Sequence, residues 1–197
     1  LLSDLRKSQI NWPVSPESLS AKITEIKKPH PYQKSAIADV CTKFSGHDRG
    51  QLIMACGLGK TFVALWVAER LKSQRTLVIV PSLLLLAKTL RDWTTHASRD
   101  FHYLPVCSDE TVRGGNGDHL VSRTYELGFP VTTNPKEVAS FLHRKGPSVV
   151  FCTYQSSSVI AEAFKISGVP AFDIAIADEA HRCAGRSSSE FATILDL

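Results

Sequence analysis

Short apolar runs alternate with longer stretches of helical periodicity along this chain. The runs are rich in Val and Ile and end at polar residues or Pro, a pattern that predicts buried strands. Between them, apolar residues recur three and four positions apart, which predicts amphipathic helices. The predicted strands are residues 51–54, 76–80, 102–107, 148–153 and 172–177, and the predicted helices are 32–44, a segment opened by Lys60 and Thr61, 83–98, 135–144 and 155–166.

Strands and helices that alternate in this way indicate an α/β fold, with one parallel sheet, right-handed crossovers and helices on both faces. A chain of 197 residues with 43% apolar content has enough material for one such domain. We assign this domain to residues 31–197. Residues 1–30 carry only weak helical patterns, near 1–10 and 18–28, and are interpreted as an N-terminal extension and connector.

One long segment interrupts the alternation. Residues 108–134 contain four glycines and mixed charge, which predicts a surface excursion with a short strand near 129–132. The chain starts without Met and stops inside a further predicted helix at 191–197. We therefore expect it to be a fragment of a longer protein.

Residues 54–61 read MACGLGKT and join the first predicted strand to the next helix. Gly57 and Gly59 can adopt positive φ, so the backbone can form a nest of N–H groups that binds phosphate at the helix N-terminus. Lys60 would then reach the β and γ phosphates, and the Thr61 hydroxyl would bind Mg²⁺. Met54 stands where the full pattern has Gly. The alternative is a glycine turn that only caps an ordinary helix.

The last predicted strand runs directly into Asp178, Glu179, Ala180 and His181. Carboxylates are unfavourable at the end of a buried strand unless they bind a cation or orient water. Because ligands lie beyond the carboxyl ends of parallel strands, we expect Lys60 and Asp178 to meet at one metal-phosphate site. Asp178 suits the magnesium ion, and Glu179 suits the attacking water. Alternatively, both carboxylates cap the next helix.

Net charge and cysteine content exclude few classes of protein function. A net charge of +4 permits contact with nucleic acid but does not argue for it. Five cysteines, odd in number and without a CxxC pair, favour reduced, buried thiols in a cytoplasmic protein over a zinc site. The most apolar segment, 77–86, is too short to span a bilayer.

Four motifs in order, MACGLGKT, VIVPSLLLLAKTLRDW, VVFCTYQSSSVI and FDIAIADEAHRCAG, resemble those of superfamily 2 helicases and translocases. They are most similar to the helicase-like motor subunit of type I, type III and single-polypeptide restriction enzymes, over roughly residues 31–197. The resemblance implies a P-loop NTPase fold, namely the first RecA-like lobe of a DEAH-type motor that uses ATP and Mg²⁺.

The resemblance also implies roles for single residues. Gln33 would read the adenine edge, or is a solvated residue at a helix start, and His181 would link the nucleotide site to later motifs or merely pack. Lys88 stands where the family usually has glutamine, which makes that DNA contact more electrostatic. Trp12 is better explained by packing than by stacking on adenine. Phosphate contacts would come from Gly57, Leu58, Gly59, Lys60 and Thr61. DNA contacts would come from Pro81, Ser82, Lys88, Thr153, Tyr154 and Gln155. The alternative for these strand-end residues is that the hydroxyl or amide only caps a helix.

We therefore expect the nucleotide-binding lobe of an ATP-dependent translocase acting on double-stranded DNA. In this superfamily a second RecA-like lobe supplies transition-state arginines. Its motifs are not in this sequence, so the chain alone should bind nucleotide weakly and hydrolyse it poorly. Nuclease or methyltransferase domains are further expected partners. Two alternatives stay open, an RNA helicase lobe and a non-catalytic nucleotide- or DNA-binding module.

Overall fold

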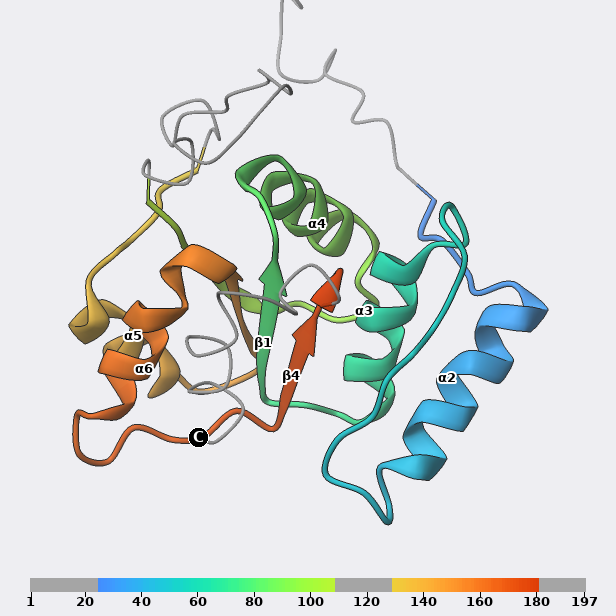
Figure 1. Ribbon diagram of the computed structural model, residues 1–197, viewed down its shortest axis with the longest axis horizontal. Coiled ribbons are helices and arrows are strands. Elements are labelled where there is room, and N and C mark those ends of the chain that lie inside the picture. The colour runs from blue at the N-terminus through green and yellow to red at the C-terminus, as the bar shows by residue number, and fades with distance from the viewer. Residues whose placement is uncertain (1–24, 109–128, 181–197) are drawn as a thin grey trace, which may run out of the picture.

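The computed structural model describes residues 25–108 and 129–180, which form a parallel sheet covered by helices (Figure 1). Its strands are β1 (Arg75–Val80), β2 (His102–Val106), β3 (Ser148–Thr153) and β4 (Ile174–Ala177). The helices are α2 (Pro31–Lys43), α3 (Lys60–Arg70), α4 (Leu83–His96), α5 (Pro135–Leu142) and α6 (Ser157–Phe164), and a short 3-10 turn, η4 (Tyr154–Ser156), precedes α6.

The sheet has four strands in the order β2-β3-β1-β4, and every pair is parallel. Val80 is in register with Thr153, and Ile79 with Ala177. The carboxyl ends of β1, β3 and β4 therefore meet at one edge of the sheet. The α/β prediction is confirmed, and this edge is where the chemistry of such sheets lies.

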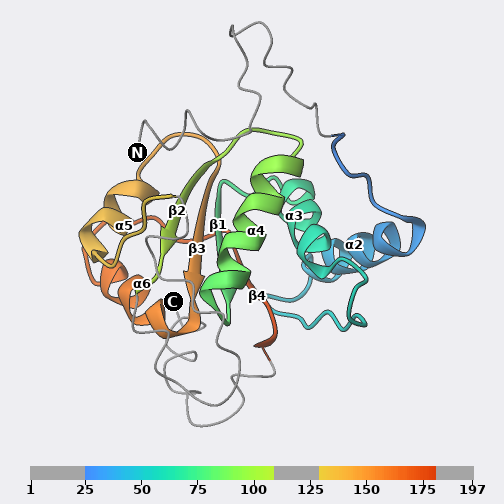
Figure 2. The same cartoon turned by 90° about the horizontal axis from the view of Figure 1, so that it is seen from above.

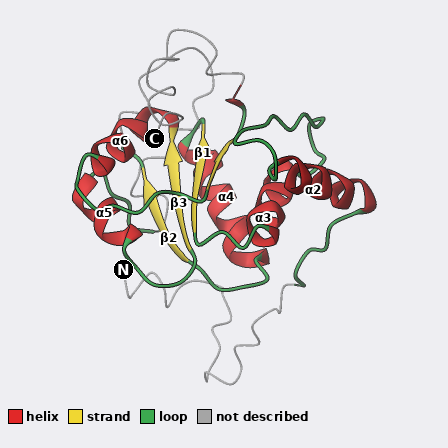
Figure 3. Ribbon diagram, turned by 90° about the horizontal axis from the view of Figure 1, so that it is seen from below, coloured by secondary structure: helices red, strands yellow, loops and turns green. Residues whose placement is uncertain are grey.

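Helices cover both faces of the sheet, as predicted (Figures 2 and 3). Successive residues of a strand point to opposite faces, so Val78 and Val80 pack under α3 and α4 while Leu77 and Ile79 pack under α5 and α6. Trp93 of α4 is buried edge-on against Phe151 of β3, with ring centroids 5.6 Å apart. A third, smaller cluster, Ile37, Val63 and Val67, joins α2 to α3.

The prediction of a buried strand at residues 51–54 is wrong. The run is irregular, Ile53 is 83% exposed, and a groove of about 450 Å³ lies between the run and α2. An apolar run becomes a strand only where neighbours supply hydrogen bonds and cover. Among the described residues, no strand pairs with this run, and only Met54 packs on the α2–α3 cluster.

Other differences concern the ends of elements. The last strand, β4, is shorter than predicted and half-buried, because it pairs only with β1 within the described chain. The helix predicted at 155–166 begins as the turn η4 before α6. The strand predicted near 129–132 is a single bridge between Val106 and Thr132.

The predicted N-terminal helices lie outside the described residues, except for 25–28, which are not helical. Within residues 25–108 and 129–180, no helix combines the length and apolar content that crossing a bilayer would require.

Candidate functional site

The glycine-rich turn before α3 has the backbone of an anion-binding site. Gly57 and Gly59 have φ of +80° and +78°, values that side chains other than Gly rarely adopt. Gly59 is the N-cap residue of α3, and no described side chain caps this end of the helix. The first N–H groups of α3 therefore keep their capacity to bind an anion, and the helix dipole adds positive potential.

Lys60, the first residue of α3, contacts the acidic pair, Asp178 and Glu179, which follows β4. Its Nζ donates a hydrogen bond to Glu179 Oε1 at 3.2 Å, although the two residues are 119 positions apart in sequence. This hydrogen bond raises the pKa of Lys60, and the charges of Glu179 and Asp178 act in the same direction. Lys60 is thus a cation at neutral pH, and the Glu179 carboxylate holds it beside the glycine-rich turn.

The turn that carries the acidic pair is held by hydrogen bonds from neighbouring strands. Asp178 N donates to Ile79 O of β1 at 2.8 Å, and Glu179 N donates to Asp178 Oδ1 at 3.0 Å. From the loop after β3, the Tyr154 hydroxyl donates to Asp178 O at 2.7 Å. Glu179 has a φ of +52°, a left-handed conformation that is uncommon for a residue other than Gly. Backbone strain of this kind concentrates at functional sites.

Gln33 is buried beneath the glycine turn. Its Oε1 accepts from His30 N, and its Nε2 donates to Leu58 O, both at 2.9 Å. The Gln33 amide thus joins the start of α2 to the turn. A Cβ added at Gly59 would lie 2.7 Å from Gln33 Nε2, so the contact also requires Gly at this position. Gln33 is therefore no solvated residue, and adenine recognition by it stays a prediction.

The six residues expected to contact DNA divide into two groups. Ser82 is the N-cap of α4 and accepts from Leu85 N, while Thr153 is fully buried and donates to Ser156 Oγ. Tyr154 directs its hydroxyl to Asp178, as described above. The alternative of a plain helix cap therefore applies to Ser82, whereas Thr153 bonds the Ser156 side chain and Tyr154 bonds a residue 24 positions away. The other group lies at the surface: Pro81 is half-buried, and Lys88 and Gln155 are exposed.

The oxygen ligands offered by residues next to Lys60 and Glu179 suit a magnesium ion that is bound mainly by phosphate. No group of three or more His, Cys, Asp or Glu residues is gathered in the described parts of the chain. Thr61 and Asp178 would supply two oxygen ligands. Mg²⁺ is commonly bound through one or two protein oxygens together with substrate phosphates and water, so the pair suits this ion when ATP is present.

Two contacts of the site were not predicted from the sequence. Trp93 Nε1 donates to Thr61 O at 3.1 Å, which anchors the start of α3 to α4. The Tyr154 bond to Asp178 O is the second. Parallel topology alone could have placed a residue after β3 near a residue after β4. No spacing or motif points to Trp93. His181, Trp12 and Cys183 lie outside the described residues, and their predicted roles stay predictions.

The expectation of buried thiols is only partly correct. Cys107 and Cys152 are buried and lie in no disulfide, and burial raises the pKa of the Cys152 thiol. Cys56, in contrast, is exposed within the glycine-rich turn.

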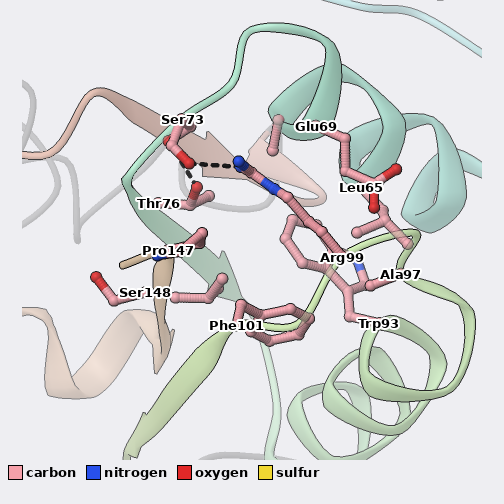
Figure 4. A pocket seen from close by; sticks show the side chains of 12 residues that line it. Leu65, Glu69, Ser73, Thr76, Trp93, Ala97, Arg99, Phe101, Pro147 and Ser148 are labelled. Carbon is pink, nitrogen blue, oxygen red and sulfur yellow. Dashed lines mark hydrogen bonds between the residues drawn. The ribbon is translucent and has the colours of Figure 1, made fainter. Parts of the chain in front are cut away.

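A small cavity lies at the opposite, amino end of the strands (Figure 4). Its volume is about 20 Å³, room for one water molecule. Ser73 anchors its wall, because its hydroxyl pairs with Thr76 and its carbonyl accepts from Arg99. The cavity lies far along the strands from Lys60 and is too small for a nucleotide.

Comparison with known proteins finds similar sequences in restriction enzymes and in a probable helicase. Residues 26–197 match the model of a family described as type III restriction enzyme, res subunit. A probable helicase of African swine fever virus is 32% identical over 154 residues, which is 78% of this chain and 16% of the viral protein.

Two solved structures share the fold. The ATP-dependent Type ISP restriction-modification enzyme LlaBIII, bound to DNA, has 37% sequence identity and a TM-score of 0.73 over 97% of this chain and 13% of its own. A nuclease-deletion mutant of the Type ISP enzyme LlaGI, in complex with a DNA substrate mimic, has 38% identity and a TM-score of 0.64 over 79% of this chain and 15% of its own. The chain thus spans about a sixth or less of each of these proteins.

Proposed function

This chain belongs to the family described as type III restriction enzyme, res subunit, and from that premise we propose that it is the nucleotide-binding lobe of an ATP-dependent DNA translocase. The observation that carries the proposal is the contact between Lys60 and Glu179 at the mouth of the glycine-rich turn. It brings a phosphate-binding cation and a carboxylate suited to water together at the carboxyl edge of a parallel sheet.

Each residue has a distinct task in this proposal. The N–H groups of residues 57–61 and the Lys60 ammonium bind the phosphates, with Gln33 holding the turn from below and contacting adenine. Thr61 and Asp178 hold Mg²⁺, and Glu179 accepts a hydrogen bond from the attacking water. Bound MgATP supplies the transferable phosphoryl group and the charge that the site stabilises. Pro81, Lys88 and Gln155 are the surface groups suited to the DNA backbone.

The partners and location of the whole protein are proposed from its similarity to these relatives. Both Type ISP relatives are described with DNA, one of them as ATP-dependent and the other as a nuclease-deletion mutant. We propose double-stranded DNA as the track, a second RecA-like lobe that completes the site, nuclease or methyltransferase domains as partners, and the cytoplasm as the location. Residues 31–197 would form the lobe and 1–30 its extension.

The test is ATP hydrolysis by the full-length product of the gene, with and without duplex DNA or RNA. We expect stimulation by duplex DNA, and loss of hydrolysis in Lys60→Ala. Lys136→Ala is the matched control, because Lys136 is an exposed lysine on α5, across the sheet from α3. Stronger stimulation by RNA would favour an RNA helicase, and full biological activity of Lys60→Ala would favour a non-catalytic binding module.

A further inference from the structure

The acidic turn after β4 needs support that its own strand does not provide. Its strand is a half-buried edge strand of four residues, whereas β1 and β3 are buried along nearly their whole length. Glu179 has the left-handed φ of +52°, which is unfavourable for a side chain with a Cβ. Contacts from elsewhere must therefore hold the turn in place.

Tyr154 supplies such a contact from two strands away. It is the first residue after β3, and its ring packs against the apolar cluster under α5 and α6. In the sheet, β1 lies between β3 and β4, so the side chain reaches across the end of β1 to the carbonyl of Asp178. The O···O distance of 2.7 Å is at the optimum for a hydroxyl donor.

The bond acts on the peptide that joins the two acidic residues. Asp178 O belongs to the same peptide unit as Glu179 N, which donates to Asp178 Oδ1. This peptide plane, together with the φ of +52° at Glu179, sets the direction in which the Glu179 side chain leaves the backbone. The same side chain holds Lys60 at 3.2 Å.

We propose that Tyr154 is a positioning residue for the acidic pair: its hydroxyl holds the Asp178–Glu179 peptide so that the Glu179 carboxylate faces the phosphate-binding lysine. The inference rests on the proposed function and deepens it. The resemblance to restriction motors implied a DNA contact for Tyr154, and the structure assigns its hydroxyl to the nucleotide site instead.

Tyr154→Phe tests the hydroxyl and keeps the ring in the apolar cluster. In the full-length product of the gene, kcat for ATP should fall about tenfold, because small displacements of a catalytic carboxylate slow the reaction steeply. KM for MgATP should change less than about twofold, because Lys60 and the glycine-rich turn are untouched. Tyr103→Phe is the matched control, since Tyr103 is an exposed residue of β2.

A second measurement does not depend on hydrolysis. Hydrogen exchange of the amides of Asp178 and Glu179 should be about tenfold faster in Tyr154→Phe and unchanged in Tyr103→Phe, with equal melting temperatures. Unchanged exchange or an unchanged kcat would overturn the inference, as would a parallel loss of kcat, MgATP affinity and thermal stability. Failure of the proposed function can be told apart from failure of this inference. If the proposed function is wrong, ATP hydrolysis would survive in Lys60→Ala, and hydrogen exchange at Asp178 and Glu179 would still decide the role of Tyr154.

Discussion

The centre of the sheet and its carboxyl edge differ in how they are built. Strands β1 and β3 are buried, covered on both faces, and packed against Trp93 and other large apolar side chains. At the edge, β4 is half-buried, and the proposed site rests on positive-φ residues and a partly exposed ion pair; residues 51–53, before the glycine-rich turn, are irregular and exposed. The difference teaches that the large buried side chains are concentrated away from the proposed site, and that a well-packed centre can hold strained residues at that site.

The strongest test of this contrast compares two apolar truncations. Phe151→Ala, in the centre, should lower the free energy of unfolding by about 3–5 kcal/mol, because it removes a fully buried ring. Ile53→Ala, at the edge, should change it by less than about 0.5 kcal/mol, because Ile53 is 83% exposed. Denaturant titration measures both values. A loss in Ile53→Ala close to that in Phe151→Ala would remove the distinction between the two regions.

A glycine series separates backbone strain from steric clash at the edge. Gly59→Ala combines a φ of +78° with a Cβ 2.7 Å from Gln33 Nε2, and it should lower stability by about 1–3 kcal/mol and weaken nucleotide binding. Gly57→Ala meets strain but no neighbouring atom within 4 Å, so its loss should be smaller. Gly46→Ala, at an open site with ordinary φ, is the control. Equal unfolding midpoints for all three variants would contradict the role of the turn.

Strain at Glu179 can be measured with two variants that both remove the carboxylate. Glu179→Gly should be more stable than Glu179→Ala by about 1 kcal/mol, because Gly adopts a φ of +52° without penalty. Thermal unfolding of the two proteins gives the difference. If Glu179→Ala is equal or more stable, the left-handed conformation carries no strain.

The smallest expected effect concerns pH. The hydrogen bond to Glu179 raises the pKa of Lys60. The ion pair therefore stabilises the folded protein fully at pH values below the ordinary lysine pKa of about 10.4. This stabilisation is lost only as the pH rises through the raised pKa of Lys60. The difference in melting temperature between wild type and Glu179→Gln should therefore stay constant from about pH 7 to 9 and shrink above about 10.4. A decline that begins between pH 7 and 9 would assign the effect to another group.

Periodicity and turn chemistry predicted the centre of the molecule well, because these signals depend on burial. The apolar runs at Leu77 to Val80 and at Ser148 to Thr153 locate β1 and β3 directly. The run at 51–54 has the same apolar character, yet it is exposed, since a strand needs a neighbour that no local pattern reveals.

The site shows the same division. Two motifs were enough to predict that Lys60 lies near the acidic pair, although no strand of the described sheet leads into the turn that carries Lys60. The bonds from Tyr154 to Asp178 and from Trp93 to Thr61 depend on side-chain reach across neighbouring elements, which spacing along the chain does not encode.

The most direct test of the account is a titration of the full-length product of the gene with MgATP, followed for wild type, Lys60→Ala and Glu179→Gln. If Lys60 and Glu179 share one phosphate site, Lys60→Ala should weaken binding by about tenfold or more, since the phosphates lose a charged partner. Glu179→Gln should strengthen binding, since the phosphates no longer compete with a carboxylate for Lys60. Equal affinities in all three proteins would show that this pair is not where the nucleotide binds.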